Sequence, residues 1–126
     1  MENRPLRAEK LVFEKLGDLI MDIQYLNRGT KLRVSLKNGF LDIYISPLEE
    51  NSFSFHFQKF NGKLYRLDTY PGEKKAKKLP TYPFHFHNVS QDNVEESPFE
   101  LGNSSIENLE KFLDFVSTFL LEDRLQ

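Results

Sequence analysis

The sequence predicts an α+β domain in which an antiparallel β-meander of about five strands lies between an N-terminal and a C-terminal helix. Three observations indicate this fold. Apolar residues recur at helical spacing near both ends of the chain, they alternate with polar residues through the middle, and Asn-Gly pairs interrupt that middle section. A length of 126 residues suits one hydrophobic core, so we expect a single domain over 1–126.

The opening segment predicts a helix that ends at Gly17. Pro5 suits a first helical turn, and Gly17 suits the C-terminal stop. Between them, apolar residues recur at helical spacing: Ala8, Leu11, Val12 and Leu16. The following segment, 18–26, fits either more helix or a first strand. We favour a strand, because Gly17 interrupts the helical pattern.

A β-hairpin is predicted over residues 32–45, where apolar and polar residues alternate on both sides of Asn38-Gly39. A two-residue type I′ turn at this pair would place Leu36 opposite Leu41. It would also bring six apolar side chains to one face of the hairpin. These six are Leu32, Val34, Leu36, Leu41, Ile43 and Ile45.

A second hairpin is predicted around Asn61-Gly62. A two-residue turn there would place Phe57 opposite Arg66 and mix polar with apolar side chains on each face. A three-residue loop with Gly62 in the left-handed conformation keeps the aromatic side chains together, so we favour that register. His56, Arg66 and Asp68 then share the opposite face, close enough to interact.

A lysine-rich loop, 73–78, leads to a short strand within residues 79–88, which its prolines place at or near a sheet edge. The lysines could track a phosphate backbone or serve solubility alone. In the strand, Phe84 and Phe86 point one way, and His85 and His87 point the other.

The chain ends in a predicted helix. Ser104 and Glu107 form a capping box at its start. A broad apolar stripe follows, and we expect it to pack on the chain's own sheet. Its members are Leu109, Phe112, Leu113, Val116, Phe119 and Leu120.

Charge and composition exclude several classes of function. The absence of cysteine excludes disulfides, thiolate metal sites and a cysteine nucleophile. No glycine-rich phosphate loop or nucleotide fingerprint indicates a cofactor, and we expect none. No apolar run suggests a membrane span or a signal peptide, so we expect a cytoplasmic protein without membrane contact. Residues 1–90 carry a net charge of +5 and 91–126 one of −7, which fits either an anionic partner for the first section or two ordinary solvated surfaces.

The predicted sheet gathers the residues that could carry chemistry on one polar surface. They are His56, Arg66, Asp68, His85 and His87. One histidine could act as general base and another as general acid on an RNA 2′-hydroxyl and its leaving oxygen, while Arg66 stabilises the charge on phosphorus. Alternatively, His85 and His87 could bind a divalent metal with His56 or Asp68. The third interpretation is that the histidines are ordinary hydrogen-bonding residues.

Several sequence elements together resemble the TumE-type toxins of prokaryotic toxin–antitoxin systems, over about residues 18 to 120. In chain order they are KLRV at 31–34, KNG at 37–39, FSFH at 53–56, GKLYRLD at 62–68 and TYPFHFHN at 81–88. The resemblance implies that the five polar residues above form the functional surface. The chain departs from the family at 69–73, where relatives commonly continue with Asn and then Ala-Pro-His-His, and at Phe84, where they often carry His or Lys.

The function predicted on this basis is that of a toxin-like component of a toxin–antitoxin pair that acts on RNA. The resemblance implies a cognate antitoxin protein as partner, and RNA as the second partner. The alternative is a non-catalytic module that binds a small protein through its sheet or its terminal helix. The sequence indicates no oligomeric state.

Overall fold

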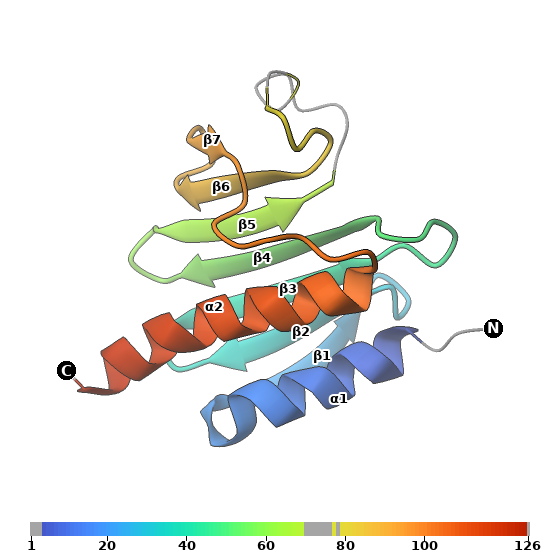
Figure 1. The fold of residues 1–126 in the computed structure, drawn as a ribbon. Coiled ribbons are helices and arrows are strands. Elements are labelled where there is room, and N and C mark those ends of the chain that lie inside the picture. The colour runs from blue at the N-terminus through green and yellow to red at the C-terminus, as the bar shows by residue number, and fades with distance from the viewer. Residues whose placement is uncertain (1–3, 70–76, 78, 126) are drawn as a thin grey trace.

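The computed structural model describes residues 4–69, 77 and 79–125. Within this part of the chain, an N-terminal helix, a seven-stranded antiparallel sheet and a C-terminal helix follow one another (Figure 1). The helical elements are α1 (Arg4–Leu16), a 3-10 turn η1 (Gly17–Leu19) and α2 (Ser105–Leu125). The strands are β1 (Asp22–Leu26), β2 (Lys31–Leu36), β3 (Gly39–Ile45), β4 (Phe53–Lys59), β5 (Leu64–Asp68), β6 (His85–Val89) and β7 (Val94–Glu95).

The strands lie in chain order, β1 to β7, so the predicted meander is confirmed. The strand count of about five is wrong, because the described sheet has seven. At one edge, β1 confirms that the ambiguous segment 18–26 contains a strand. At the other edge, β7 has only two residues, which pair with Phe86 and His87. Two residues are too few for an alternation of apolar and polar side chains to indicate a strand.

The first hairpin forms with a register that differs from the prediction. Leu36 pairs with Gly39 instead of Leu41, so the two-residue turn falls at 37–38. The partner shifts by two residues, which leaves the predicted apolar face unchanged. Gly39 serves a different purpose from the one expected. A Cβ at this position would lie 2.0 Å from the backbone oxygen of Gln58, so Gly39 allows β3 to pass close to β4.

The second hairpin confirms the predicted register. Phe57 pairs with Tyr65, and His56 pairs with Arg66. Gly62 has a φ of +94°, the left-handed conformation that the three-residue loop requires. The choice between two turn lengths therefore followed correctly from the need to keep aromatic residues on one face.

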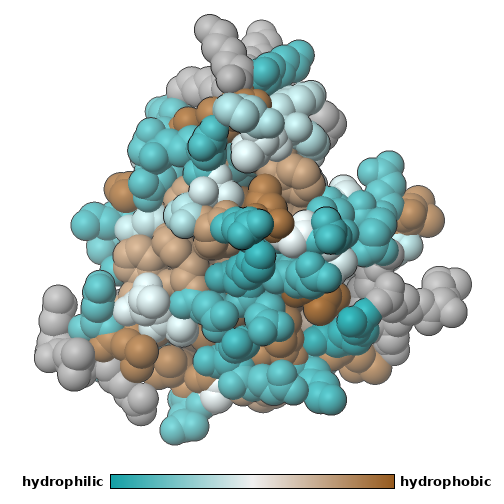
Figure 2. Space-filling view, viewed as in Figure 1, coloured by the Kyte–Doolittle hydropathy of each residue, from teal (hydrophilic) through white to brown (hydrophobic). Residues whose placement is uncertain are grey.

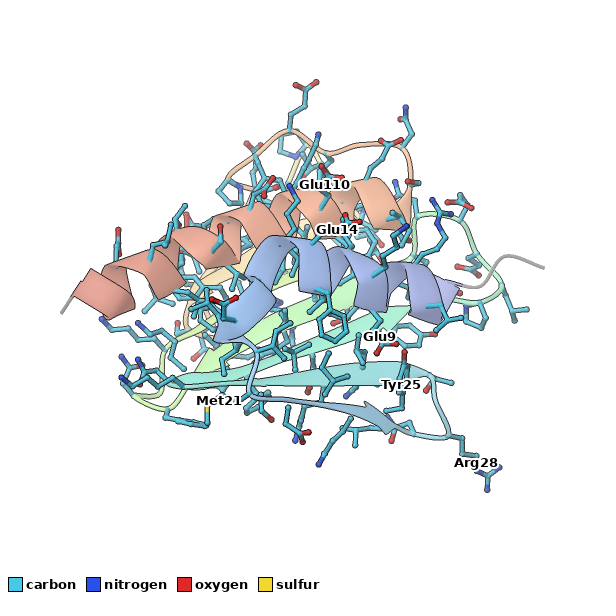
Figure 3. The ribbon with its side chains drawn as sticks, turned by 90° about the horizontal axis from the view of Figure 1, so that it is seen from below. Glu9, Glu14, Met21, Tyr25, Arg28 and Glu110 are labelled. Carbon is cyan, nitrogen blue, oxygen red and sulfur yellow. The ribbon has the colours of Figure 1, made fainter. Side chains whose placement is uncertain are left out.

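Both helices cover the same face of the sheet, and Figure 3 shows the two layers seen from the side. Contacts between rings join sheet to helix, including Phe55 with Phe112 at 5.7 Å and Phe86 with Phe115 at 5.4 Å between ring centroids. The apolar stripe of α2 thus packs on the chain's own sheet, as predicted. Between α1 and β1, the Tyr25 hydroxyl donates to the Glu9 carboxylate (Figure 3).

The ends of the helices also follow the sequence signals. Gly17, with a φ of +48°, ends α1. At the start of α2, the Ser104 hydroxyl accepts a hydrogen bond from the Glu107 backbone N–H at 3.2 Å. The Glu107 carboxylate accepts a hydrogen bond from the Asn103 N–H at 3.0 Å. In an ordinary capping box it would accept from the N–H of Ser104 instead. Within the described residues, neither helix is long and apolar enough to cross a bilayer.

The outer side of the helices differs from the buried side. Figure 2 shows a mixture of residue types there, with hydrophilic ones gathered across the centre of the view. The opposite face of the sheet carries no helix within the described part of the chain. This second face of the sheet, which we call the open face, holds the candidate site.

Candidate functional site

Five successive strands, β2 to β6, each place one polar side chain in a single line across the open face. We call this line the polar row: Arg33, Asp42, His56, Arg66 and His87. Each member is the direct cross-strand partner of the next. Directly opposite residues on antiparallel strands have Cβ atoms about 4.5–5.5 Å apart, so neighbours in the row are within reach of one another.

One end of the polar row is fixed by an ion pair. The Arg33 guanidinium donates two hydrogen bonds of 2.8 Å to the Asp42 carboxylate, one from Nε and one from Nη2. The same guanidinium lies 4.3 Å from the centroid of the Phe40 ring. Asp42 is therefore held beside its other cross-strand neighbour, His56. Arg33 and Asp42 were not among the predicted site residues, although the alternating pattern places both on the polar side of the first hairpin.

His56 occupies the middle of the row in a defined ring orientation. Its Nε2 lies 3.0 Å from the Gln58 Oε1, while the Gln58 amide nitrogen donates to the Lys59 and Lys63 carbonyls. Because the amide oxygen can only accept, His56 Nε2 carries the hydrogen, and the lone pair of the neutral ring is on Nδ1. Partial burial lowers the pKa of His56 below its usual value of 6.5.

A buried cluster of three groups overlaps the end of the row at His87 and also contains Asp68 and His85. One potential ligand atom from each lies within 4.8 Å of the others. His85 and His87 are 1% and 0% exposed, and Asp68 is 9% exposed. They meet because β5 pairs with β6, which places Asp68 opposite His85 and Arg66 opposite His87.

Backbone carbonyls fix the ring orientation of both clustered histidines. His85 Nδ1 lies 3.0 Å from the Pro83 carbonyl oxygen, and His87 Nδ1 lies 2.8 Å from that of Gln91. A carbonyl only accepts, so each Nδ1 carries a hydrogen and each neutral ring has its lone pair on Nε2. Burial lowers the pKa of His87 from its ordinary value, which favours this neutral form.

Arg66 connects the polar row to the buried cluster. Its Nη2 lies 3.4 Å from His87 Nε2, and its Nε lies 3.6 Å from the Asp68 carboxylate. The Nε atom is buried and makes no hydrogen bond to any residue that the structure describes. A buried donor without an acceptor is costly.

The structure brings all five predicted residues onto one face, and four of them touch or nearly touch. Arg66, Asp68, His85 and His87 make up this group, while His56 is the cross-strand neighbour of Arg66. The two buried histidines are not surface residues. The predicted lysine-rich loop lies outside the described residues except for Lys77, which is exposed.

Comparisons with known proteins assign no family to this chain. No protein-family model, no curated protein and no solved structure matches this chain. What the site does is therefore inferred from its own geometry and chemistry.

Proposed function

We propose that this protein is a toxin-like component of a prokaryotic toxin–antitoxin pair, and that it cleaves RNA on its open face in the cytoplasm. The observation that carries the proposal is the cross-strand pairing of His56 with Arg66 in the middle of the polar row. An imidazole beside a guanidinium provides a base and an anion-binding group at one place, which is what phosphodiester cleavage requires.

The chemistry uses the 2′-hydroxyl of RNA as its nucleophile. His56 Nδ1 takes the proton from that hydroxyl, and the resulting oxygen attacks phosphorus. The bond from phosphorus to the 5′-oxygen breaks, leaving a 2′,3′-cyclic phosphate on one product. The departing 5′-oxygen takes a proton from water. The lowered pKa of His56 keeps its base form dominant at neutral pH.

Arg66 binds the phosphate and stabilises the negative charge that grows on its oxygens. The Arg66 side chain is 23% exposed, and hydrogen bonds from a guanidinium to phosphate oxygens are charge-assisted and strong. Because His87 is completely buried, we assign it and Asp68 to holding the guanidinium in place. These two are positioning residues, and only His56 and Arg66 contact RNA in this mechanism.

A second candidate function, a non-catalytic protein-binding module, is favoured by apolar side chains around α1 and the edge strand β1. Leu6, Phe13 and Met21 are more than half exposed. Exposed apolar side chains beside an unpaired strand edge are suited to a protein partner. A cognate antitoxin bound there would be compatible with RNA cleavage on the open face, whereas a binding module alone would leave RNA intact.

The test is cleavage of total cellular RNA by purified protein and three variants. We expect His56→Gln to reduce the rate by about 100-fold or more, because a general base contributes at least that factor. Arg66→Gln should reduce it by about 100-fold, the typical effect of losing a charge-stabilising donor. Arg28→Gln, at an exposed turn pointing away from the sheet (Figure 3), is the matched control and should cleave normally.

Two results would contradict the proposal. If wild-type protein leaves RNA intact, both with a chelator and with added Zn²⁺, the binding-module candidate replaces it. If His56→Gln cleaves as fast as wild type, the activity does not come from this face. Circular dichroism of each variant excludes loss of folding as the cause of a reduced rate.

A further inference from the structure

We propose that Asp68, His85 and His87 form a binding site for a divalent first-row transition metal of the Zn²⁺ class. The proposal concerns metal binding alone and does not depend on RNA cleavage. Its basis is the convergence of one carboxylate and two imidazoles, with ligand atoms within 4.8 Å of one another, in a buried part of the open face.

The imidazoles are already arranged as ligands. In metal sites, the non-ligating ring nitrogen usually donates to a backbone carbonyl or a carboxylate, which fixes the lone pair of the ligating nitrogen. Here the Pro83 and Gln91 carbonyls hold the Nδ1 atoms of His85 and His87, respectively. Neither ring therefore needs a change of tautomer to bind a metal through Nε2, although Nε2 of His87 faces the Arg66 guanidinium.

The ligand set determines the class of metal. Two imidazole nitrogens and one carboxylate oxygen are typical of Zn²⁺ sites that retain an open position for water, and of other first-row divalent ions. Mg²⁺ and Ca²⁺ prefer sites made of oxygen ligands. The chain contains no cysteine, so no thiolate competes for the ion.

Arg66 adds a feature that makes the site unusual. Its guanidinium contacts two of the three proposed ligands, His87 and Asp68. A metal ion bound there would take over the His87 lone pair and repel the guanidinium. Arg66 therefore competes with the metal, and metal binding would release it toward the solvent side of the open face.

The experiment is calorimetric titration of chelator-treated, dialysed protein with ZnCl₂. Wild type should bind one Zn²⁺ per chain. His85→Ala and Asp68→Asn should each weaken binding by about 100-fold or more, since even second-shell changes cost 10–100-fold. His56→Ala, which removes the histidine outside the cluster, is the matched control and should bind as wild type does. Arg66→Gln should bind more tightly, because it removes the competing positive charge.

Further measurements keep the result decisive. Co²⁺ in place of Zn²⁺ should give visible absorption bands of a bound, imidazole-ligated ion in wild type and in His56→Ala, but not in His85→Ala. If His85→Ala does not fold, the nearly isosteric Asp68→Asn provides the test. Equal Zn²⁺ affinity in wild type and Asp68→Asn, or equal affinity of wild type for Mg²⁺ and Zn²⁺, would overturn the proposal. Weaker Zn²⁺ binding in a folded Arg66→Gln would overturn the proposed competition between Arg66 and the metal.

Discussion

The Arg66 Nη2 atom lies 3.4 Å from Nε2 of His87, and this contact joins the solvent side of the sheet to its buried cluster. Because His87 Nδ1 already donates to the Gln91 carbonyl, its Nε2 is an acceptor for the guanidinium. The position of Arg66 thus depends on a histidine that is fully buried. A change at His87 is therefore expected to affect phosphate binding without direct contact.

This relationship predicts the kinetic effect of His87→Ala. Loss of the acceptor should leave the Arg66 guanidinium less well placed for phosphate, so RNA cleavage should slow. Steady-state rates of wild type and folded His87→Ala measure the effect. An unchanged rate would show that His87 does not position Arg66 for phosphate.

The rate of RNA cleavage should depend on pH through His56. Burial lowers the pKa of this imidazole below 6.5, so the base form dominates at neutral pH. We expect kcat/KM to be constant near pH 7 and to fall on the acid side, with a midpoint below 6.5. A pH–rate profile, together with an NMR titration of the His56 ring, measures both midpoints. A profile with its acid midpoint above pH 7 would contradict the assignment of His56 as base.

Stability should change with pH in the same range. A histidine whose pKa is lowered in the folded state binds fewer protons there than in the unfolded state. The free energy of unfolding therefore falls as the pH decreases from about 6.5, the unfolded value, toward the folded pKa of His56. Urea unfolding of wild type and His56→Gln measures the difference. The slope against pH in this window should be smaller for the variant, and an equal slope would show that His56 does not contribute.

Gly39 should tolerate a methyl group poorly. In Gly39→Ala the new Cβ would meet the Gln58 backbone oxygen, and neither strand can move away without breaking the pairing of β3 and β4. We expect a loss of about 1–3 kcal/mol in unfolding free energy, as for other overpacked sites. Gly29→Ala is the control. It has open space around its Cβ and should cost about 1–2 kcal/mol, only through its φ of +87°. Gly39→Ala with stability equal to wild type would rule out the close approach.

Much of the fold follows from alternation of residue types, because the face of each side chain depends only on whether its position is odd or even. Phe57 and Tyr65 had to share the core face, and this requirement fixed the loop at Gly62 and placed His56 beside Arg66. The Asn38-Gly39 pair was misleading for the opposite reason. Two registers give the same apolar face, and the contact of Gly39 with β4 that distinguishes them is not visible in the hairpin's own sequence.

The residues of the candidate site were predicted from the sequence, but their burial was not. Alternation places His85 and His87 on the polar side, yet it gives no indication that both are buried. Their ring orientation depends on the Pro83 and Gln91 carbonyls, which belong to the segments flanking β6. Hydrogen bonds to the backbone leave no signature in residue type. For the same reason, the sequence left acid–base chemistry, metal binding and an ordinary hydrogen-bonding role as alternatives for the same histidines.

The measurement that tests the central claim most directly is cleavage of a defined RNA beside the same oligonucleotide made entirely of 2′-deoxynucleotides. The mechanism uses the 2′-hydroxyl as nucleophile, so wild-type protein should cut only the RNA. Mass spectrometry should find a 2′,3′-cyclic phosphate on the upstream product. Cleavage of both strands at similar rates, or RNA left intact under every metal condition, would contradict the account.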